Sequence, residues 1–301
     1  MIFCLRRNMR NEFLNSKRSQ EEQVALSYGG QGNLRRLRFH HSPGGQQFLR
    51  RHMPAGPEQT LTIPSKDQLV ESAQIVWKTK DIPTPPDDLF ETLERGHREG
   101  FLGFKPYYYK ETTFTNAAEF PGPGGDWILS NIQNGNIDKE AAHLRGMWVL
   151  TDSTPKPKDY NGGRQMYPSD RLGAVLKELR DEGKIEVPYW HKSIPLDSRF
   201  AVSPDEIDNL VVPEVAIILG ADESQITVPK KIERDVLNYL YQLDLDDGNT
   251  LEWLAERFGS EHRLMSGYVD FLHLADINYY LSNHQDNMVG FRLQIGFPTS
   301  T

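Results

Sequence analysis

The last 54 residues, Gly248 to Thr301, constrain the fold most strongly, because three glycine-containing landmarks occur there in close succession. The landmarks are Gly248-Asn249-Thr250-Leu251-Glu252-Trp253, Arg263-Leu264-Met265-Ser266-Gly267 and Gly290-Phe291-Arg292-Leu293. Between the second and the third lies a stretch of different composition, Tyr268 to Asn287. We expect this stretch to be a ligand-contacting surface displayed on a rigid scaffold.

Eleven of the twenty residues in this stretch are Asn, Asp, His or Tyr, and none is Lys, Arg, Glu, Trp or Met. Tyrosine supplies a large amphipathic contact area at low entropy cost, and Asn and Ser add adaptable hydrogen bonds. An irregular, partly buried loop is the alternative, because such loops contain the same polar residues. The predicted contact residues, which we expect to lie on one face of the domain, are Tyr268, Asp270, Phe271, His273, Asp276, Asn278, Tyr279, Tyr280, Asn283, His284, Asp286 and Asn287. The predicted core anchors are Leu272, Leu274, Ile277 and Leu281.

Residues 1–62 are expected to form a disordered basic tail. The first 60 residues hold ten Lys and Arg against four Asp and Glu, a charge of about +6 within a total of −8. The remaining residues therefore carry about −14. A solvated tail and a basic arm for an acidic partner are the two interpretations. We expect no nucleic-acid contact apart from this tail.

Cys4 is the only cysteine, which excludes a disulfide within the chain and a cysteine-based zinc site. No apolar run approaches the roughly 18 residues of a membrane span. The apolar start of the chain is interrupted by Arg6-Arg7, far short of a secretory signal. We expect a soluble protein, cytoplasmic by default.

Local signals divide the chain into a helical segment at residues 63–100 and a domain at 101–301. Ser65 is a predicted N-cap with Gln68 three residues on, which is a capping-box pattern. Ser203, Pro204 and Glu206 form the same pattern, with proline at the first helical position. The apolar run at 147–150 predicts a buried strand, and the polar run at 151–170 predicts a long surface loop.

Asn249 and Glu252 have two interpretations from local rules. They match a capping box, which predicts a helix from Leu251 to Phe258. Their oxygens also suit a loose calcium site, because calcium accepts varied oxygen geometry. An EF-hand is excluded, because Gly248 comes one residue early and Ala255 stands where the loop needs a glutamate. No other cofactor is expected.

No catalytic motif is present: there is no nucleophile elbow, phosphate-binding loop, His-Glu-x-x-His or dinucleotide fingerprint. His191, which follows Tyr189 and Trp190, is interpreted as a partly buried structural histidine. The sequence therefore favours a binding protein over an enzyme, with an unknown protein or glycan as ligand. An enzyme with a cysteine-free metal site and a structural or assembly component are the alternatives.

The three landmarks resemble motifs of the formylglycine-generating (sulfatase-modifying factor) family. Its Gly-Asn-Val-x-Glu-Trp, Arg-Val-x-Gly-Gly and Gly-Phe-Arg segments match in order, with Thr250 for Val and Ser266 for the first Gly. The resemblance implies an α+β, C-type-lectin-like fold with long loops, preceded here by the helical segment and the tail. The catalytic members act through cysteines that this chain lacks, so the resemblance does not extend to formylglycine generation or to copper binding through thiols. The family's calcium sites point again to Asn249 and Glu252, and Arg292 is expected to pair with an acidic group inside the fold.

The composition of 268–287 also resembles that of variable proteins of diversity-generating retroelements, which use the same fold as a scaffold. Their variable segment lies near such a Gly-Phe-Arg strand, and diversification alters adenines in Asn codons. Those codons cannot become Lys, Glu, Gln, Met or Trp, and the stretch holds only Gln285 from that set. The resemblance implies a diversified contact surface in which Gln285 is a fixed position.

Overall fold

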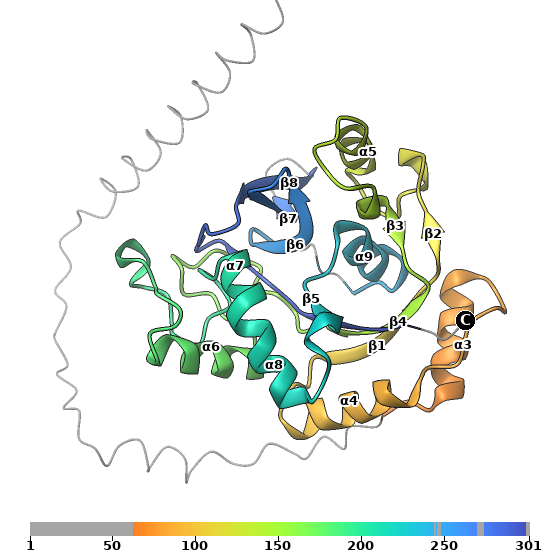
Figure 1. Ribbon diagram of the computed structural model, residues 1–301, viewed down its shortest axis with the longest axis horizontal. Coiled ribbons are helices and arrows are strands. Elements are labelled where there is room, and N and C mark those ends of the chain that lie inside the picture. The colour runs from red at the N-terminus through yellow and green to blue at the C-terminus, as the bar shows by residue number, and fades with distance from the viewer. Residues whose placement is uncertain (1–62, 244, 246–247, 270–273, 299–301) are drawn as a thin grey trace, which may run out of the picture. The chain divides into compact units, whose positions relative to one another are not determined.

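The computed structural model describes residues 63–243, 245, 248–269 and 274–298, and the predicted tail lies outside them (Figure 1). The α-helices are α3 (Lys66–Trp77), α4 (Asp87–Arg98), α5 (Gly125–Gln133), α6 (Arg171–Asp181), α7 (Pro204–Glu206), α8 (Val212–Leu219) and α9 (Lys231–Asp235). Short 3₁₀ segments are Ala117–Glu119, Lys139–Ala142, Tyr189–His191 and Glu223–Gln225, and π-helical turns are Ile207–Val211 and Val236–Leu240. The strands are β1 (Phe104–Tyr109), β2 (Thr112–Thr113), β3 (His143–Leu144), β4 (Met147–Asp152), β5 (Ile226–Thr227), β6 (Leu251–Phe258), β7 (His262–Val269), β8 (Leu274–Leu281), β9 (Val289–Gly290) and β10 (Gln294–Pro298).

The two capping boxes predicted from sequence are both formed. The Ser65 hydroxyl accepts from the Gln68 N–H, and the Gln68 side chain accepts from the Ser65 N–H. Ser203 and Glu206 make the same reciprocal pair at the start of α7, with Pro204 at the first helical position. Each box satisfies N–H groups that a helix start leaves without partners.

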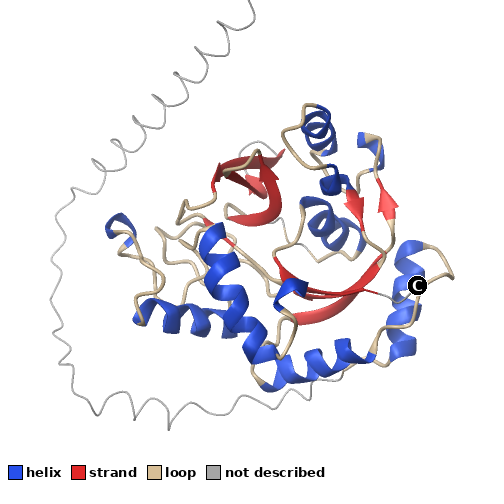
Figure 2. Ribbon diagram, viewed as in Figure 1, coloured by secondary structure: helices blue, strands red, loops and turns tan. Residues whose placement is uncertain are grey.

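The first sheet has the strand order β1–β4–β10–β5, with all neighbours antiparallel (Figure 2). Its central strand β4 is the predicted buried strand, and successive side chains point to opposite faces. Trp148 and Leu150 join one apolar cluster with α3, α4 and α8. Val149 joins a second cluster with Ile232 of α9 and residues of the second sheet. The sheet therefore has an apolar core on each face.

The second sheet has the order β8–β7–β6–β9, and β8 is its edge strand. Strand β6 pairs antiparallel with β7 and parallel with β9. The prediction of a helix from Leu251 to Phe258 is therefore wrong. The Asn249–Glu252 capping box does not form, because the Glu252 carboxylate binds Arg292 instead.

The described residues form a mixed α and β fold, in agreement with the α+β class, and the loop at 153–170 is long as expected. The described residues belong to one compact unit. Leu69 of α3 and Leu89 of α4 are buried in the same cluster as Trp148. The helical segment 63–100 is therefore part of this unit and not a separate module.

Candidate functional site

The stretch predicted to contact a ligand forms most of an edge hairpin and the turn that follows it. Strands β7 and β8 pair from His262 opposite Leu281 to Val269 opposite Leu274. Tyr268 and Asp276 lie in this ladder, opposite Ala275 and Gly267. The predicted contact residues Asp270, Phe271 and His273, and the predicted anchor Leu272, lie outside the described residues.

The described contact residues of β8 do not share one face, because side chains alternate along a strand. Tyr279 stacks on Phe258, with ring centroids 4.1 Å apart and planes 7° apart, and its edge meets His262. Tyr280 instead stacks on His284, at 4.8 Å and 20°. Asn278 lies on the same face of β8 as Tyr280, two residues before it, and is exposed. The expectation of a single face therefore fails within β8.

The predicted anchors also differ from one another. Ile277 is half-buried and packs against the cluster that contains α9, as expected of an anchor. Leu281 is 46% exposed, so its assignment as a core anchor is wrong. Alternation puts Leu281 on the same face of β8 as Ile277, but Leu281 lies at the end of the strand ladder, opposite His262, where its side chain is left exposed.

Hydrogen bonds from its backbone and from the Gln285 side chain attach the turn after β8 to the rest of the fold. The Gln285 amide donates to both carboxylate oxygens of Glu206, at 2.7 and 2.9 Å, and to the Glu186 carbonyl at 2.7 Å. The Asp286 carbonyl accepts from the Ala201 N–H, and the Ser282 carbonyl accepts from the Asp205 N–H. Asn283 is exposed, while His284, Asp286 and Asn287 are partly exposed.

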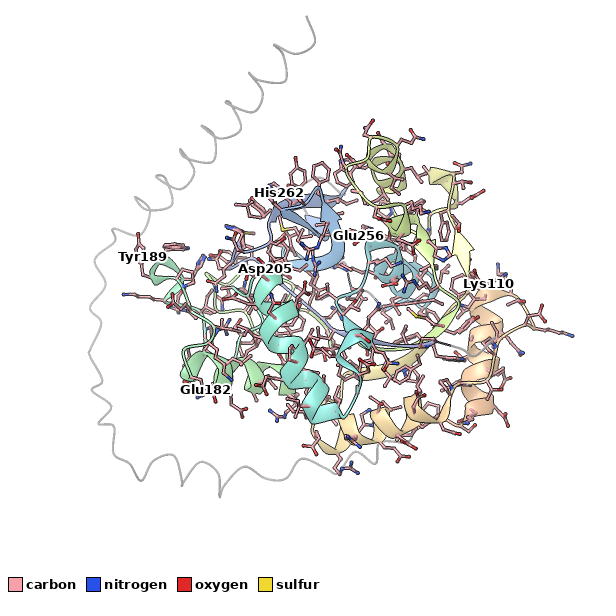
Figure 3. All side chains as sticks on the ribbon, viewed as in Figure 1. Lys110, Glu182, Tyr189, Asp205, Glu256 and His262 are labelled. Atoms are coloured by element: carbon pink, nitrogen blue, oxygen red, sulfur yellow. The ribbon has the colours of Figure 1, made fainter. Side chains whose placement is uncertain are left out.

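Two aromatic residues beside this turn were missed by the sequence analysis. Tyr189 is 74% exposed and Trp190 is 66% exposed, and their rings meet edge to face at 4.9 Å. Both line an open cavity of about 510 Å³ together with Gln285 and Glu206. Figure 3 shows Tyr189 projecting away from the helices around it. The available signal was the pair of adjacent aromatics after Pro188, which we interpreted only through the buried His191.

We call the set Tyr189, Trp190, Tyr280, Asn283, His284 and Asn287 the C-terminal surface. Tyr280 and His284 are stacked, and Gln285 of the turn lines the same cavity as Tyr189 and Trp190. Asn287 donates to the Tyr160 hydroxyl at 2.6 Å. Exposed Trp and Tyr on rigidly held backbone are typical of protein-interaction surfaces.

The two tyrosines of β8 offer a matched comparison, because each is 39% exposed. We expect Tyr279→Ala to lower the free energy of unfolding by about 1–2 kcal/mol, since it removes a stacked ring from Phe258 at the rim of the core. Tyr280→Ala should cost less than about 1 kcal/mol, because its ring contact is with the surface turn. Urea denaturation of both variants measures the difference, and equal losses would contradict the assigned packing.

In the interior of the fold, Glu252 lies in a buried ionic cluster. Arg292 donates to both of its carboxylate oxygens, at 2.7 and 3.0 Å, Tyr167 donates at 2.5 Å, and Arg234 lies 3.4 Å away. Burial alone would raise the pKa of Glu252, but the two arginines outweigh burial and hold it far below its usual range. The predicted pairing of Arg292 with an internal acidic group is confirmed.

This arrangement does not fit the predicted calcium site. A calcium ion needs six to eight oxygen ligands, and both Glu252 oxygens are already bonded within a cationic neighbourhood. Asn249 and Thr250 bind the long loop instead. The Asn249 N–H donates to the Lys158 carbonyl, and the Thr250 hydroxyl donates to the Pro157 carbonyl. These bonds dock the long loop onto β6. Within the described ranges, no group of three or more His, Cys, Asp or Glu side chains is placed to hold a metal ion.

Comparison with family models, with curated proteins and with solved structures found no match to this chain. In the part of the chain that the structure describes, no helix is both long enough and apolar enough to span a membrane.

Proposed function

We propose that this chain is a non-enzymatic binding protein that contacts a protein or glycan through the C-terminal surface. The observation that carries the proposal is the contrast within the turn at 282–288. Its backbone and Gln285 are bonded to the scaffold, while Asn283 and His284 face outward. A rigid frame with outward side chains lets residues vary without loss of folding.

The proposal includes a C-type-lectin-like fold of the sulfatase-modifying-factor type for residues 101–301. Its support is topological. Strands β1 and β10, near the two ends of this region, both pair with β4. The ends of the region therefore lie on one sheet, as expected for that fold. The Gly290-Phe291-Arg292 segment leads directly into β10.

We further propose that the segment 268–287 is diversified by a retroelement. Gln285 supports this idea. Within the stretch it is the one residue that changes at the adenines of an Asn codon cannot produce, and its amide is bonded to Glu206. Its replacement would leave the partly buried Glu206 carboxylate with fewer donors. A position under that constraint is expected to stay fixed while its neighbours change.

Sequencing the gene and its flanks across many cells of one population tests the proposal without knowledge of the ligand. We expect substitutions at adenines in the codons of Asn278, Tyr280, Asn283, His284 and Asn287, and a near-copy of the segment nearby. The codons of Ile277, Ser282 and Gln285 should be invariant, because those residues pack or bond inward.

Matched control codons are those of Asn131, Asn134 and Asn136, which lie in an asparagine-rich segment elsewhere in the chain. Sequencing errors at adenines would appear there at the same rate. An invariant segment 268–287 with no nearby copy would refute diversification. Changes spread equally over Ile277, Ser282 and the exposed positions would contradict the assigned scaffold.

A further inference from the structure

Strand β8 ends the second sheet, and in the described part of the chain no strand lies beside its outer edge. Figure 1 shows β8 on the side of β7 that faces away from β6. The edge of an unpaired strand carries N–H and C=O groups that pair readily with another extended backbone. The occupant that suits this edge is therefore a further strand.

One hydrogen bond shows which backbone groups of β8 face outward. The Ser282 N–H donates to the Glu261 carbonyl at 2.8 Å, which continues the register of β7 with β8 by one pair. In an antiparallel ladder, hydrogen-bonded pairs alternate with pairs that are not hydrogen-bonded. The even-numbered residues of β8 therefore bond to β7. The residues that turn their N–H and C=O groups outward are Ala275, Ile277, Tyr279 and Leu281.

Two further hydrogen bonds agree with this assignment. The Tyr279 N–H donates to the Asn278 side-chain oxygen at 2.9 Å, and the Leu281 carbonyl accepts from the His284 N–H at 2.9 Å. Both groups bond to residues other than those of β7, as outward groups do. Within the described residues, no segment outside the β7–β8 hairpin bonds to the backbone of Ile277. The middle of the edge is open to a partner.

Strand β8 lacks the features that keep sheet edges apart. Its eight residues contain no proline and no lysine, and Asp276 is the one charged residue among them. The pairing with β7 is continuous and has no bulge. Tyr279 and Tyr280 are each 39% exposed, and Leu281 is 46% exposed. A regular edge with exposed aromatic and apolar side chains favours pairing with another chain.

We propose that a second copy of this chain pairs with β8, antiparallel and about a two-fold axis at Asn278. A two-fold axis joins the same edge of both copies, and outward residues must lie opposite outward residues. With the axis at Asn278, Ala275 lies opposite Leu281 and Ile277 lies opposite Tyr279, each pair occurring twice. This register uses all four outward residues. An axis at Ile277 or Tyr279 leaves one of the four without an opposite residue in β8.

The side chains suit the same register. Ile277 of each copy lies opposite Tyr279 of the other, and cross-strand pairs of an aromatic with a β-branched residue stabilise sheets. The Tyr279 N–H would exchange its bond to Asn278 for a bond to the Ile277 carbonyl of the second copy. Position 276, which carries the negative charge, lies opposite Tyr280. The two charged positions are therefore separated by four residues, about 14 Å along the strands.

This inference goes beyond the proposed function, because strand pairing uses backbone groups and is independent of the ligand. The pairing would join the second sheets of two copies into one sheet. The dimer would carry two C-terminal surfaces, which raises the avidity for a ligand with repeated sites.

Sedimentation velocity of the full chain tests the dimer. Between about 1 and 100 μM, the mass should rise from that of the monomer, 34.5 kDa, toward twice that value. Asn278→Lys and Asn278→Asp should each weaken dimerisation at least about tenfold, because like charges then meet at the axis. An equimolar mixture of the two variants should dimerise again, since Lys meets Asp. Asn134→Lys, the same change at an exposed residue after α5, should alter dimerisation less than about twofold.

A disulfide tests the register. In a Cys4→Ser background, Asn278→Cys should give a covalent dimer with oxidised glutathione, because this pair is not hydrogen-bonded and its Cα atoms lie about 4.5 Å apart. Tyr280→Cys should give none, since its two copies would lie about 14 Å apart. Circular dichroism checks that each variant is folded.

Several results would overturn the proposal. A chain that stays monomeric at about 100 μM would leave the edge to a strand of a different protein. A dimer that folded Asn278→Lys does not weaken would use another surface. A mixture of the Lys and Asp variants that stays monomeric, or a disulfide at Tyr280→Cys in place of Asn278→Cys, would contradict the axis at Asn278. None of these results bears on the sequencing test of the proposed function.

Discussion

Replacing Arg292 with methionine is expected to lower the free energy of unfolding by about 3–5 kcal/mol. The guanidinium makes two hydrogen bonds to Glu252 and one to the Asp152 carbonyl at 2.5 Å, and both side chains of the pair are 1% exposed. Its loss leaves a buried carboxylate with Tyr167 and the more distant Arg234 as partners. Urea denaturation monitored by tryptophan fluorescence, to which the buried Trp148 and Trp253 contribute, measures the change.

A control variant at Arg263 separates the effect of burying an ion pair from the effect of ion pairing itself. Arg263 also binds a carboxylate through two hydrogen bonds, at 2.8 and 2.9 Å, but its partner Asp208 is 35% exposed. Arg263→Met should therefore cost only about 1 kcal/mol, because solvent screens the pair. Adding Glu252→Gln to Arg292→Met should recover part of the loss, since the uncompensated buried charge disappears. Equal costs for the two arginine variants would contradict this account of the cluster.

Glu256→Gln is expected to make the protein more stable than the unaltered chain at about pH 8. Burial raises the pKa of Glu256 from 4.5 to about 7, so the folded state binds the proton more tightly than the unfolded state. Ionisation then favours unfolding, and stability falls as pH rises from 4.5 to about 7. The shift corresponds to about 3 kcal/mol.

The measurement is the difference in unfolding free energy between Glu256→Gln and the unaltered chain as a function of pH. This difference should grow by about 3 kcal/mol between pH 4.5 and about pH 8, in favour of the variant. The exposed Glu261→Gln serves as the reference, for which the difference should stay nearly constant. A flat profile for Glu256→Gln would show that the carboxyl is not held in an unfavourable environment.

The candidate surface was only partly visible in the sequence. Composition identified the stretch 268–287, whose described turn is attached to the scaffold through Gln285. It did not identify Tyr189 and Trp190, which lie about 90 residues earlier and meet that turn only in the fold. The division of Tyr279 and Tyr280 between two environments follows from strand register, which composition does not contain.

The sequence by itself determined the elements that depend on close neighbours along the chain. The capping boxes at Ser65 and Ser203 formed as predicted, because each joins groups only three residues apart. The buried strand β4 was also predicted from adjacent residues. Its continuous apolar run is what a strand needs when both faces of its sheet are covered.

Only the tertiary structure decided the roles of Glu252 and Glu256. Asn249 and Glu252 satisfy the local rule for a helix start, yet the segment is a strand held between β7 and β9. Glu252 binds Arg292, forty residues away in the chain, and such a buried ion pair outweighs one local cap. Glu256 lies in a bulge that exists only once β6 and β7 are paired, and its buried carboxylate accepts from the Lys231 N–H of α9. Contacts between residues far apart in sequence set these outcomes, and their energies exceed local propensity.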